Sequence, residues 1–144
     1  MHVRQQIRNQ LKTTLTGLTT TGANVFNSRV YNHDALPCLT IYTLGEELGE
    51  ESANKQFRIL EVMVEVRAKA ANNLEDTLDT IGAEVEDAIF ANGDTTLSGK
   101  CKDFDYEGLS IELSGEAEQA VGLMTMRFIA IYRVNKADVE TLIA

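Results

Sequence analysis

Residues 24–44 read NVFNSRVYNHDALPCLTIYTL and predict two strands joined by a short turn. The turn is expected at Asn32-His33-Asp34, because short polar side chains bond to nearby backbone groups and tolerate unusual dihedral angles. Pro37 is the only proline of the chain, and it has no N–H group to donate to a neighbouring strand. We therefore place it at the first residue of the second strand, which continues to Leu44 as a β-rich run.

The other strands are predicted from side chains that alternate between apolar and polar. The clearest run is 58–69, in which every second residue from Leu60 to Ala68 is apolar. Strict alternation is typical of an antiparallel strand with one covered and one open face. Further strands are expected at 100–107, 109–113 and 121–134.

Two helices are predicted from apolar residues that recur every three or four positions. The first is expected to fray toward Gly22, where a glycine can stop it. The second is expected to begin at a capping Asn73, with Glu75 and Asp76 in the first turn, where the helix dipole favours negative charge. Asn92-Gly93 supplies its left-handed stop. The apolar stripe of the first helix comprises Val3, Ile7, Leu11, Leu15 and Leu18.

These elements predict an α+β fold, with both helices packed on one face of an antiparallel sheet. Residues 1–134 form the single domain of this prediction, and residues 135–144 form a polar tail without a fixed position. The helix-covered face is expected to contain Leu60, Val62, Val64, Val66, Met126, Phe128 and Tyr132, packed on Ile7, Leu11, Leu78 and Val85.

The segment Gly45–Ser52 contains two glycines and four glutamates without any periodicity. Such a composition is typical of a mobile loop. Two interpretations remain open at this point. The segment is either the solvated tip of a hairpin or an arm that becomes ordered only against a neighbouring subunit.

The chain is acidic, with 13 basic residues, 22 acidic residues and a net charge of −9. Phosphate binding relies on clustered Lys and Arg, so a DNA-wrapping role is disfavoured. This charge suits a soluble protein, or one that nucleic acid passes without sticking. The N-terminus lacks the apolar core of a signal peptide, and the longest apolar run is too short to span a membrane. We expect synthesis in the cytosol and no membrane partner.

The sequence contains no evident catalytic or metal-binding grouping. Cys38 and Cys101 have no CxxC motif or Cys/His cluster around them, so we expect reduced, half-buried side chains without a metal or cofactor. The carboxylates of the second helix lack a neighbouring histidine, which favours a solvated helix face over acid–base chemistry. His2 lies at the terminus and His33 in the predicted turn. We therefore expect no enzymatic activity.

Several short stretches carry a resemblance that spans nearly the whole chain. They are residues 15–22 (LTGLTTTG), 28–31 (SRVY), 36–42 (LPCLTIY), the predicted helix at 73–92, 109–113 (LSIEL) and 122–133. Taken together, these stretches resemble the tail terminator proteins (tail completion, minor tail protein U-like) of long-tailed bacteriophages and prophages.

Proteins of this family cap the end of the tail tube with a hexameric ring, stop its elongation and provide the surface that joins tail to head. The resemblance implies a structural virion protein with a tail-terminator or tail-tube-like fold, placed at the head-proximal end of the tail and assembled in the host bacterial cytoplasm. It implies three partners: further copies of the chain, the tail tube protein and the head–tail connector protein. Genome DNA would pass through the ring without specific binding.

The face of the last strand that carries Ile129 and Ile131 is more apolar than a solvated face requires, which predicts partial cover by another chain. The same face carries charged residues, and the glutamates of the 45–52 segment are available to a neighbour. The candidate residues for a subunit or partner interface are Glu46, Glu47, Glu50, Glu51, Arg67, Arg127 and Arg133.

Two alternative functions remain. One is another head–tail connector, neck or tail component, because the fold recurs among tail proteins. The other is a small ligand-binding or enzymatic α+β domain, which requires convergent polar groups in a pocket with shifted pKa values.

Overall fold

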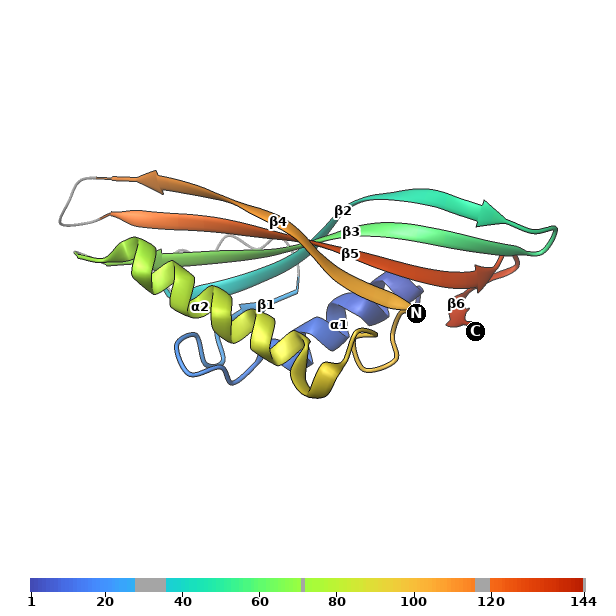
Figure 1. Ribbon diagram of the computed structural model, residues 1–144, viewed down its shortest axis with the longest axis horizontal. Coiled ribbons are helices and arrows are strands. Elements are labelled where there is room, and N and C mark those ends of the chain that lie inside the picture. The colour runs from blue at the N-terminus through green and yellow to red at the C-terminus, as the bar shows by residue number, and fades with distance from the viewer. Residues whose placement is uncertain (28–35, 71, 116–119, 144) are drawn as a thin grey trace.

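Two helices lie on the same face of a twisted six-stranded sheet in the residues that the computed structural model describes, 1–27, 36–70, 72–115 and 120–143 (Figure 1). This arrangement confirms the predicted α+β fold. The elements are α1 (Val3–Leu15), β1 (Val25–Phe26), β2 (Cys38–Glu51), β3 (Lys55–Lys69), α2 (Leu74–Ile89), the 3-10 turn η1 (Ala91–Gly93), β4 (Asp103–Ser114), β5 (Val121–Asn135) and β6 (Asp138–Leu142).

The sheet has the strand order β1-β2-β3-β5-β4, and β6 pairs with β5. Four long strands, β2, β3, β5 and β4, form its continuous antiparallel part. The predicted sheet was purely antiparallel, but β1 pairs with β2 in parallel, with Val25 opposite Leu39. Parallel neighbours need a crossover connection of about a dozen residues instead of a tight turn, and the segment between β1 and β2 has about that length.

Of the first predicted strand, 24–31, the described residues form a strand only at Val25–Phe26, and residues 28–31 lie outside the described part of the chain. The turn predicted at 32–34, including His33, lies outside the described residues. Pro37 directly precedes β2 instead of being its first residue. The Asn24 side-chain amide donates to the Pro37 carbonyl over 3.2 Å, and the Leu39 N–H donates to the Asn24 carbonyl over 2.9 Å. These two bonds hold β1 against the start of β2.

The core lies between the helices and the sheet, as the alternation in β3 predicted. Val62, Val64 and Val66 are completely buried, and so are Phe128 and Tyr132 on the neighbouring strand β5. Apolar burial of this kind is the main favourable contribution to folding. The same cluster contains the predicted Leu60, Met126, Ile7, Leu11, Leu78 and Val85.

The helix ends differ from the sequence predictions in two places. At the start of α1, the His2 Nδ1 accepts a hydrogen bond from the Arg4 N–H over 3.1 Å, so a histidine acts as the cap. Asn73 precedes α2 in a left-handed conformation with φ of 57° and makes no side-chain cap bond. The usual cap has extended backbone, from which its side chain reaches the first turn, and Asn73 does not adopt it. The left-handed stop after α2 is confirmed, because Asn92 and Gly93 both have positive φ.

The first helix ends at Leu15 and does not extend toward Gly22. The following turn closes on itself, because the Gly17 N–H donates to the Gly22 carbonyl over 2.8 Å. Both glycines have positive φ, a conformation that glycine adopts without a steric penalty. The Thr20 N–H donates to the Glu84 carboxylate on α2 over 2.9 Å. One of the α2 carboxylates thus holds a loop in place.

The prediction of a mobile loop at Gly45–Ser52 is wrong, because β2 continues to Glu51 and pairs with β3 (Figure 1). Residues 44–61 form a long hairpin, which we call the arm. Shifts in pairing register between Thr43 and Gly45 and between Leu48 and Glu51 interrupt the alternation that sequence reasoning looks for. A β-bulge of this kind inserts a residue without ending the strand. The hairpin interpretation is correct, but its turn is confined to the residues between Glu51 and Lys55.

The C-terminal prediction is also wrong in part. Residues 138–142 form β6, with Val134 opposite Leu142. Val139 and Leu142 pack against the core, which is why this short polar-looking segment has a fixed position. The strands expected at 100–107 and 109–113 are one strand, β4, with a register shift between Tyr106 and Gly108. None of the helices in the described part of the chain is long and apolar enough to cross a membrane.

Candidate subunit interface

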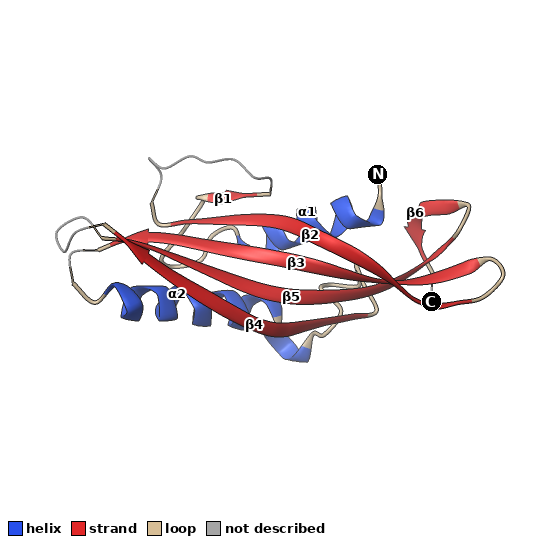
Figure 2. Ribbon diagram, turned by 90° about the horizontal axis from the view of Figure 1, so that it is seen from above, coloured by secondary structure: helices blue, strands red, loops and turns tan. Residues whose placement is uncertain are grey.

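The sheet has two edges that are unpaired within the described residues, and they lie on opposite sides of the molecule (Figure 2). At one edge, β4 pairs only with β5. At the other, β1 covers β2 only at Leu39 and Thr40, so the rest of β2 along the arm has an open side. An open edge presents a row of N–H and C=O groups to which another chain can add a strand.

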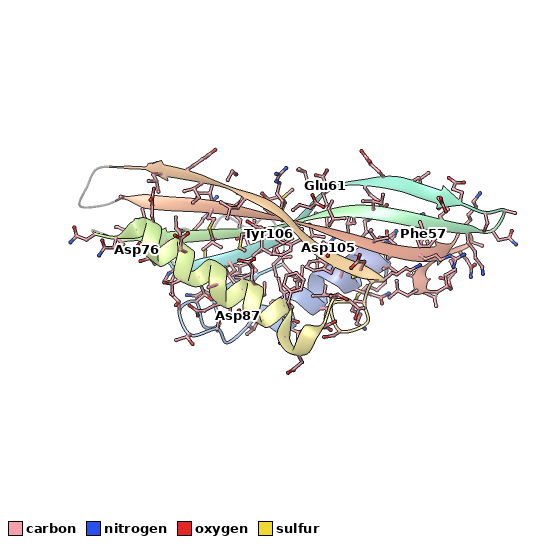
Figure 3. The ribbon with its side chains drawn as sticks, viewed as in Figure 1. Phe57, Glu61, Asp76, Asp87, Asp105 and Tyr106 are labelled. Carbon is pink, nitrogen blue, oxygen red and sulfur yellow. The ribbon has the colours of Figure 1, made fainter. Side chains whose placement is uncertain are left out.

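The β4 edge also carries an exposed apolar row. Tyr106, Leu109, Ile111 and Leu113 are 38%, 42%, 38% and 53% exposed. Leu109 and Ile111 lie opposite the buried Met126 and Met124 of β5, so the row belongs to the helix-covered side of the sheet. Figure 3 shows Tyr106 on β4 beside α2, which carries Asp76 and Asp87. Exposed apolar rows of this kind mark interaction surfaces.

Two leucines of the arm are equally exposed. Leu44 is 57% exposed and Leu48 is 56% exposed, and both lie on β2, beyond the two residues that β1 covers. Leu48 lies opposite Arg58, on the same side of the sheet as the core. Both edges of the sheet therefore combine open backbone groups with apolar side chains.

Among the predicted interface residues, Glu46 is used within its own chain. Its carboxylate accepts a hydrogen bond from Arg4 Nη1 over 2.6 Å and lies 3.4 Å from Arg58 Nη1. It also accepts a hydrogen bond from the Tyr132 hydroxyl. Burial and the bond to Glu46 raise the pKa of Tyr132 to about 12. Glu46 thus joins α1, β3 and β5 to the base of the arm.

The other arm glutamates point to solvent. Glu47 and Glu50 are exposed, and Glu51 lies 3.2 Å from the Lys136 ammonium group. A shallow groove runs along Glu47, with Ile59 and Ile129 in its lining. Ile129, on which sequence reasoning based the expectation of a covered face, therefore lies beside the arm.

The three predicted arginines lie at separate places on the open side of the sheet. The Arg67 Nε donates to the Glu65 carboxylate over 2.8 Å. The Arg133 guanidinium lies 5.0 Å from the centre of the Phe57 ring, and the Lys102 ammonium lies 4.7 Å from the same centre. Arg127 is exposed, and its Nη2 reaches over Gly108, so that a Cβ at Gly108 would be 3.1 Å from it. The structure does not bring the seven predicted residues together into one patch.

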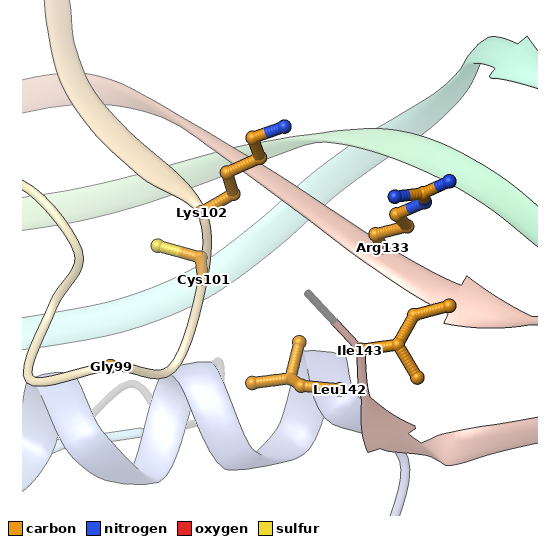
Figure 4. A pocket seen from close by; sticks show the side chains of 6 residues that line it. All are labelled: Gly99, Cys101, Lys102, Arg133, Leu142 and Ile143. Atoms are coloured by element: carbon orange, nitrogen blue, oxygen red, sulfur yellow. The ribbon is translucent and has the colours of Figure 1, made fainter.

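A cavity of about 430 Å³ lies beside the C-terminal end of the chain, between the start of β4 and β6 (Figure 4). Its lining includes Cys101, whose pKa burial and the nearby carboxylates of Asp103 and Asp94 raise to about 12. A thiol with this pKa is not a nucleophile at neutral pH. Leu142 and Ile143 line the cavity with apolar side chains, and Lys102 and Arg133 line it with positive charge. Its lining residues are Gly99, Cys101, Lys102, Arg133, Leu142 and Ile143.

Of the histidines and cysteines that sequence reasoning singled out, His2, Cys38 and Cys101 lie among the described residues. Burial, followed by the neighbouring Arg4, lowers the pKa of His2, and its ring caps α1. Burial raises the pKa of Cys38. Both cysteines are free thiols and buried, more deeply than the predicted half-burial. Within the described residues, no group of three His, Cys, Asp or Glu side chains could hold a metal ion.

The sequence matches no family model and no curated protein. Among solved structures, a chain in the virion of a native gene transfer agent particle has a similar fold, with a TM-score of 0.53 and 17% sequence identity. The similarity covers 93% of this chain and 92% of that chain. At this identity the likeness concerns the fold, and it carries no residue roles from one chain to the other.

Proposed function

We propose that this protein is a structural component of a phage-type virion, and that it acts there as a tail terminator. It would form a closed ring of six copies on the head-proximal end of the tail tube, stop the elongation of the tube and provide the surface to which the head attaches. The observation that carries the proposal is a sheet with two open apolar edges, in a fold shared over nearly its whole length with a virion component.

The direction of the strands favours a head-to-tail ring. The four strands β2, β3, β5 and β4 alternate in direction, so the two outer strands β2 and β4 run antiparallel to each other. A neighbour related by a rotation therefore places its β2 antiparallel to β4 and continues the ladder. A heterologous contact of this kind closes into a ring when the rotation fits, and closure removes the open edges. The number six comes from the family resemblance and not from the strand geometry.

The charge of the chain is compatible with a DNA conduit. The net charge of −9 makes non-specific retention of phosphates unfavourable. The mechanism we propose needs no catalysis and no cofactor, because the protein acts by adding to a template and by presenting no further face to tube subunits. Its partners would be copies of itself, the tail tube protein and the head–tail connector protein.

The test combines the purified chain with the tail tube protein of the same particle. We expect a species of six copies by native mass spectrometry, and tubes that stop growing with this protein at one end by electron microscopy. Tubes that grow to the same length with and without the protein would contradict the terminator role. Binding to the capsid vertex without binding to tubes would instead assign the protein to the connector or neck.

A further inference from the structure

Arg127 occupies an unusual place on the open side of the sheet. It lies on β5, opposite Gly108 of the edge strand β4. Because Gly108 has no side chain, the guanidinium extends over β4 toward the open edge. Among the described residues, no carboxylate lies within ion-pair distance of Arg127. The open side of the β4 edge therefore carries the Arg127 guanidinium together with the carboxylates of Asp103, Asp105 and Glu112, and the other side carries the apolar row.

The arm has the complementary arrangement. Leu48 is exposed on the helix-covered side of the sheet, and Glu47, its neighbour in the strand, points to the open side. Side chains alternate between the two sides of a strand, so an arm that pairs with β4 meets it with Leu48 on the apolar side and Glu47 on the charged side. The base of the arm is tied to the domain, because Glu46 bonds to Arg4, Arg58 and Tyr132.

We propose that β4 from Tyr106 to Leu113 binds the arm of a second copy of this chain as an added antiparallel strand. In this pairing Leu48 of the arm lies opposite Leu109, and Leu44 lies near Leu113. The pairing rests on the proposed ring, and it names the two surfaces that form each contact between neighbours.

The same register determines the charged contact. With Leu48 opposite Leu109, Glu47 lies opposite Ser110, on the same side of the strand as Gly108. The Arg127 guanidinium over Gly108 then meets the Glu47 carboxylate of the second copy. In the alternative register the two copies are not displaced along the strand direction. Glu47 then lies beside Asp103, because Glu47, Ile59, Ile131 and Asp103 are aligned across the sheet, and the carboxylates of Asp103 and Asp105 repel it. Of these two registers, the one with Leu48 opposite Leu109 brings Glu47 to Arg127 as well as to Glu112, which lies two residues from Ser110 on the same side of β4. The other register brings Glu47 to carboxylates alone.

Charge reversal tests the ionic half of the proposal. Glu47→Arg and Arg127→Glu should each weaken self-association of the full-length chain by about tenfold or more, because like charges then face each other across the contact. The double variant should recover most of the loss. Glu75→Arg on α2 is the control, because it changes the net charge by the same amount as Glu47→Arg, from −9 to −7. A smaller net negative charge reduces the repulsion between copies, so the control variant should not weaken self-association.

Disulfide trapping tests the register. One batch of protein carries Leu48→Cys and the other Leu109→Cys, and the two are mixed and oxidised. We expect cross-linked pairs in the mixture and not in either batch alone. The natural Cys38 and Cys101 are 2% and 6% exposed, so they do not compete. Ala83→Cys, on the exposed face of α2, replaces Leu109→Cys in the control mixture.

The outcomes separate this proposal from the proposed function. A six-copy species that ignores the charge reversals and gives no cross-link above the control would overturn the pairing and leave the terminator ring intact. Cross-linked pairs and a rescued double variant, with open filaments in place of a ring, would support the pairing and contradict the ring. A chain that stays monomeric at every concentration, without cross-links, overturns the pairing.

Discussion

The Tyr132 hydroxyl donates a hydrogen bond to the Glu46 carboxylate, which lies 86 residues away in the sequence. Tyr132 is completely buried in the core on β5, and Glu46 lies on β2 at the base of the arm. The same carboxylate binds Arg4 of α1 and Arg58 of β3. One acidic side chain therefore sets the direction in which the arm leaves the domain.

We expect Glu46→Ala to lower the free energy of unfolding by about 2 kcal/mol, because the buried Tyr132 hydroxyl loses its acceptor and the guanidinium groups of Arg4 and Arg58 lose their ion-pair partner. The ion pair with Arg4 contributes little to this loss, because Arg4 is more than a third exposed and solvent screens its charge. Urea denaturation measures the change. Glu47→Ala, at the next and exposed position, should change the stability by less than about 0.5 kcal/mol. Equal effects of the two substitutions would contradict the role assigned to Glu46.

The raised pKa of Tyr132 leads us to expect a loss of stability at alkaline pH. Its pKa of about 12 in the folded chain lies above the ordinary value of 10, so the fold favours the neutral hydroxyl. The corresponding stabilisation is fully present below pH 10 and is lost as the pH rises from 10 to 12. We expect wild-type protein to lose about 2 kcal/mol more than Tyr132→Phe over this range, measured by urea denaturation at each pH. The more exposed Tyr106→Phe serves as the control and should follow wild type more closely.

Val64 provides the sharpest test of the core. Its side chain is completely buried, and Val64→Asp would place an uncompensated carboxylate among apolar groups. The cost is comparable to the whole stability of a small domain, so we expect the variant to be unfolded by circular dichroism. Glu61→Asp on the exposed side of the same strand should remain folded. A cooperative thermal transition for Val64→Asp near that of wild type would disprove the packing described for the sheet.

Gly122 tests how closely α2 approaches the sheet. A Cβ at this position would lie 2.8 Å from Leu78 Cδ1 and 3.1 Å from Leu74 Cγ. Gly122→Ala should therefore push α2 away from β5 and lower the free energy of unfolding by about 1–3 kcal/mol. The matched control is Gly45→Ala, because nothing lies within 4 Å of a Cβ there. Thermal denaturation of both variants should show a lower midpoint for Gly122→Ala alone.

The sequence was sufficient to predict the elements that follow a regular period. The stripe of α1 from Val3 to Leu15 and the alternation of β3 reflect burial on one side, and both are confirmed. Leu18, the last predicted member of the stripe, lies beyond the end of α1 and is partly buried. The parallel pairing of β1 and the strand β6 were missed because their positions depend on contacts far away in the sequence. The arm was missed because register shifts and glycines hide its alternation.

The candidate interface shows the same limit of local patterns. Glu46 and Glu47 are indistinguishable in the sequence, yet one is held inside the chain and the other is exposed. The alternation of Leu109, Ile111 and Leu113 correctly predicts a strand with an apolar side. It does not reveal that α2 leaves this side partly open, because the position of a helix over a sheet is decided by the whole core.

In the proposed assembly, the β2 strand of the arm pairs with β3 on one side and with β4 of a second copy on the other. Hydrogen exchange tests this pairing. Along β2, alternate N–H groups point toward β3 or toward the open edge. In the free chain we expect slow exchange for the first set and fast exchange for the second set between Leu44 and Glu51. Assembly should protect the second set and the outward N–H groups of β4, because both then enter a shared ladder.

The N–H groups of β3 are paired on both sides in either state, so they serve as the internal control. Mass-spectrometric exchange on the monomer and on the assembled protein measures all three sets together. If the outward N–H groups of the arm exchange equally fast in both states, the arm does not add to the sheet of a neighbouring copy.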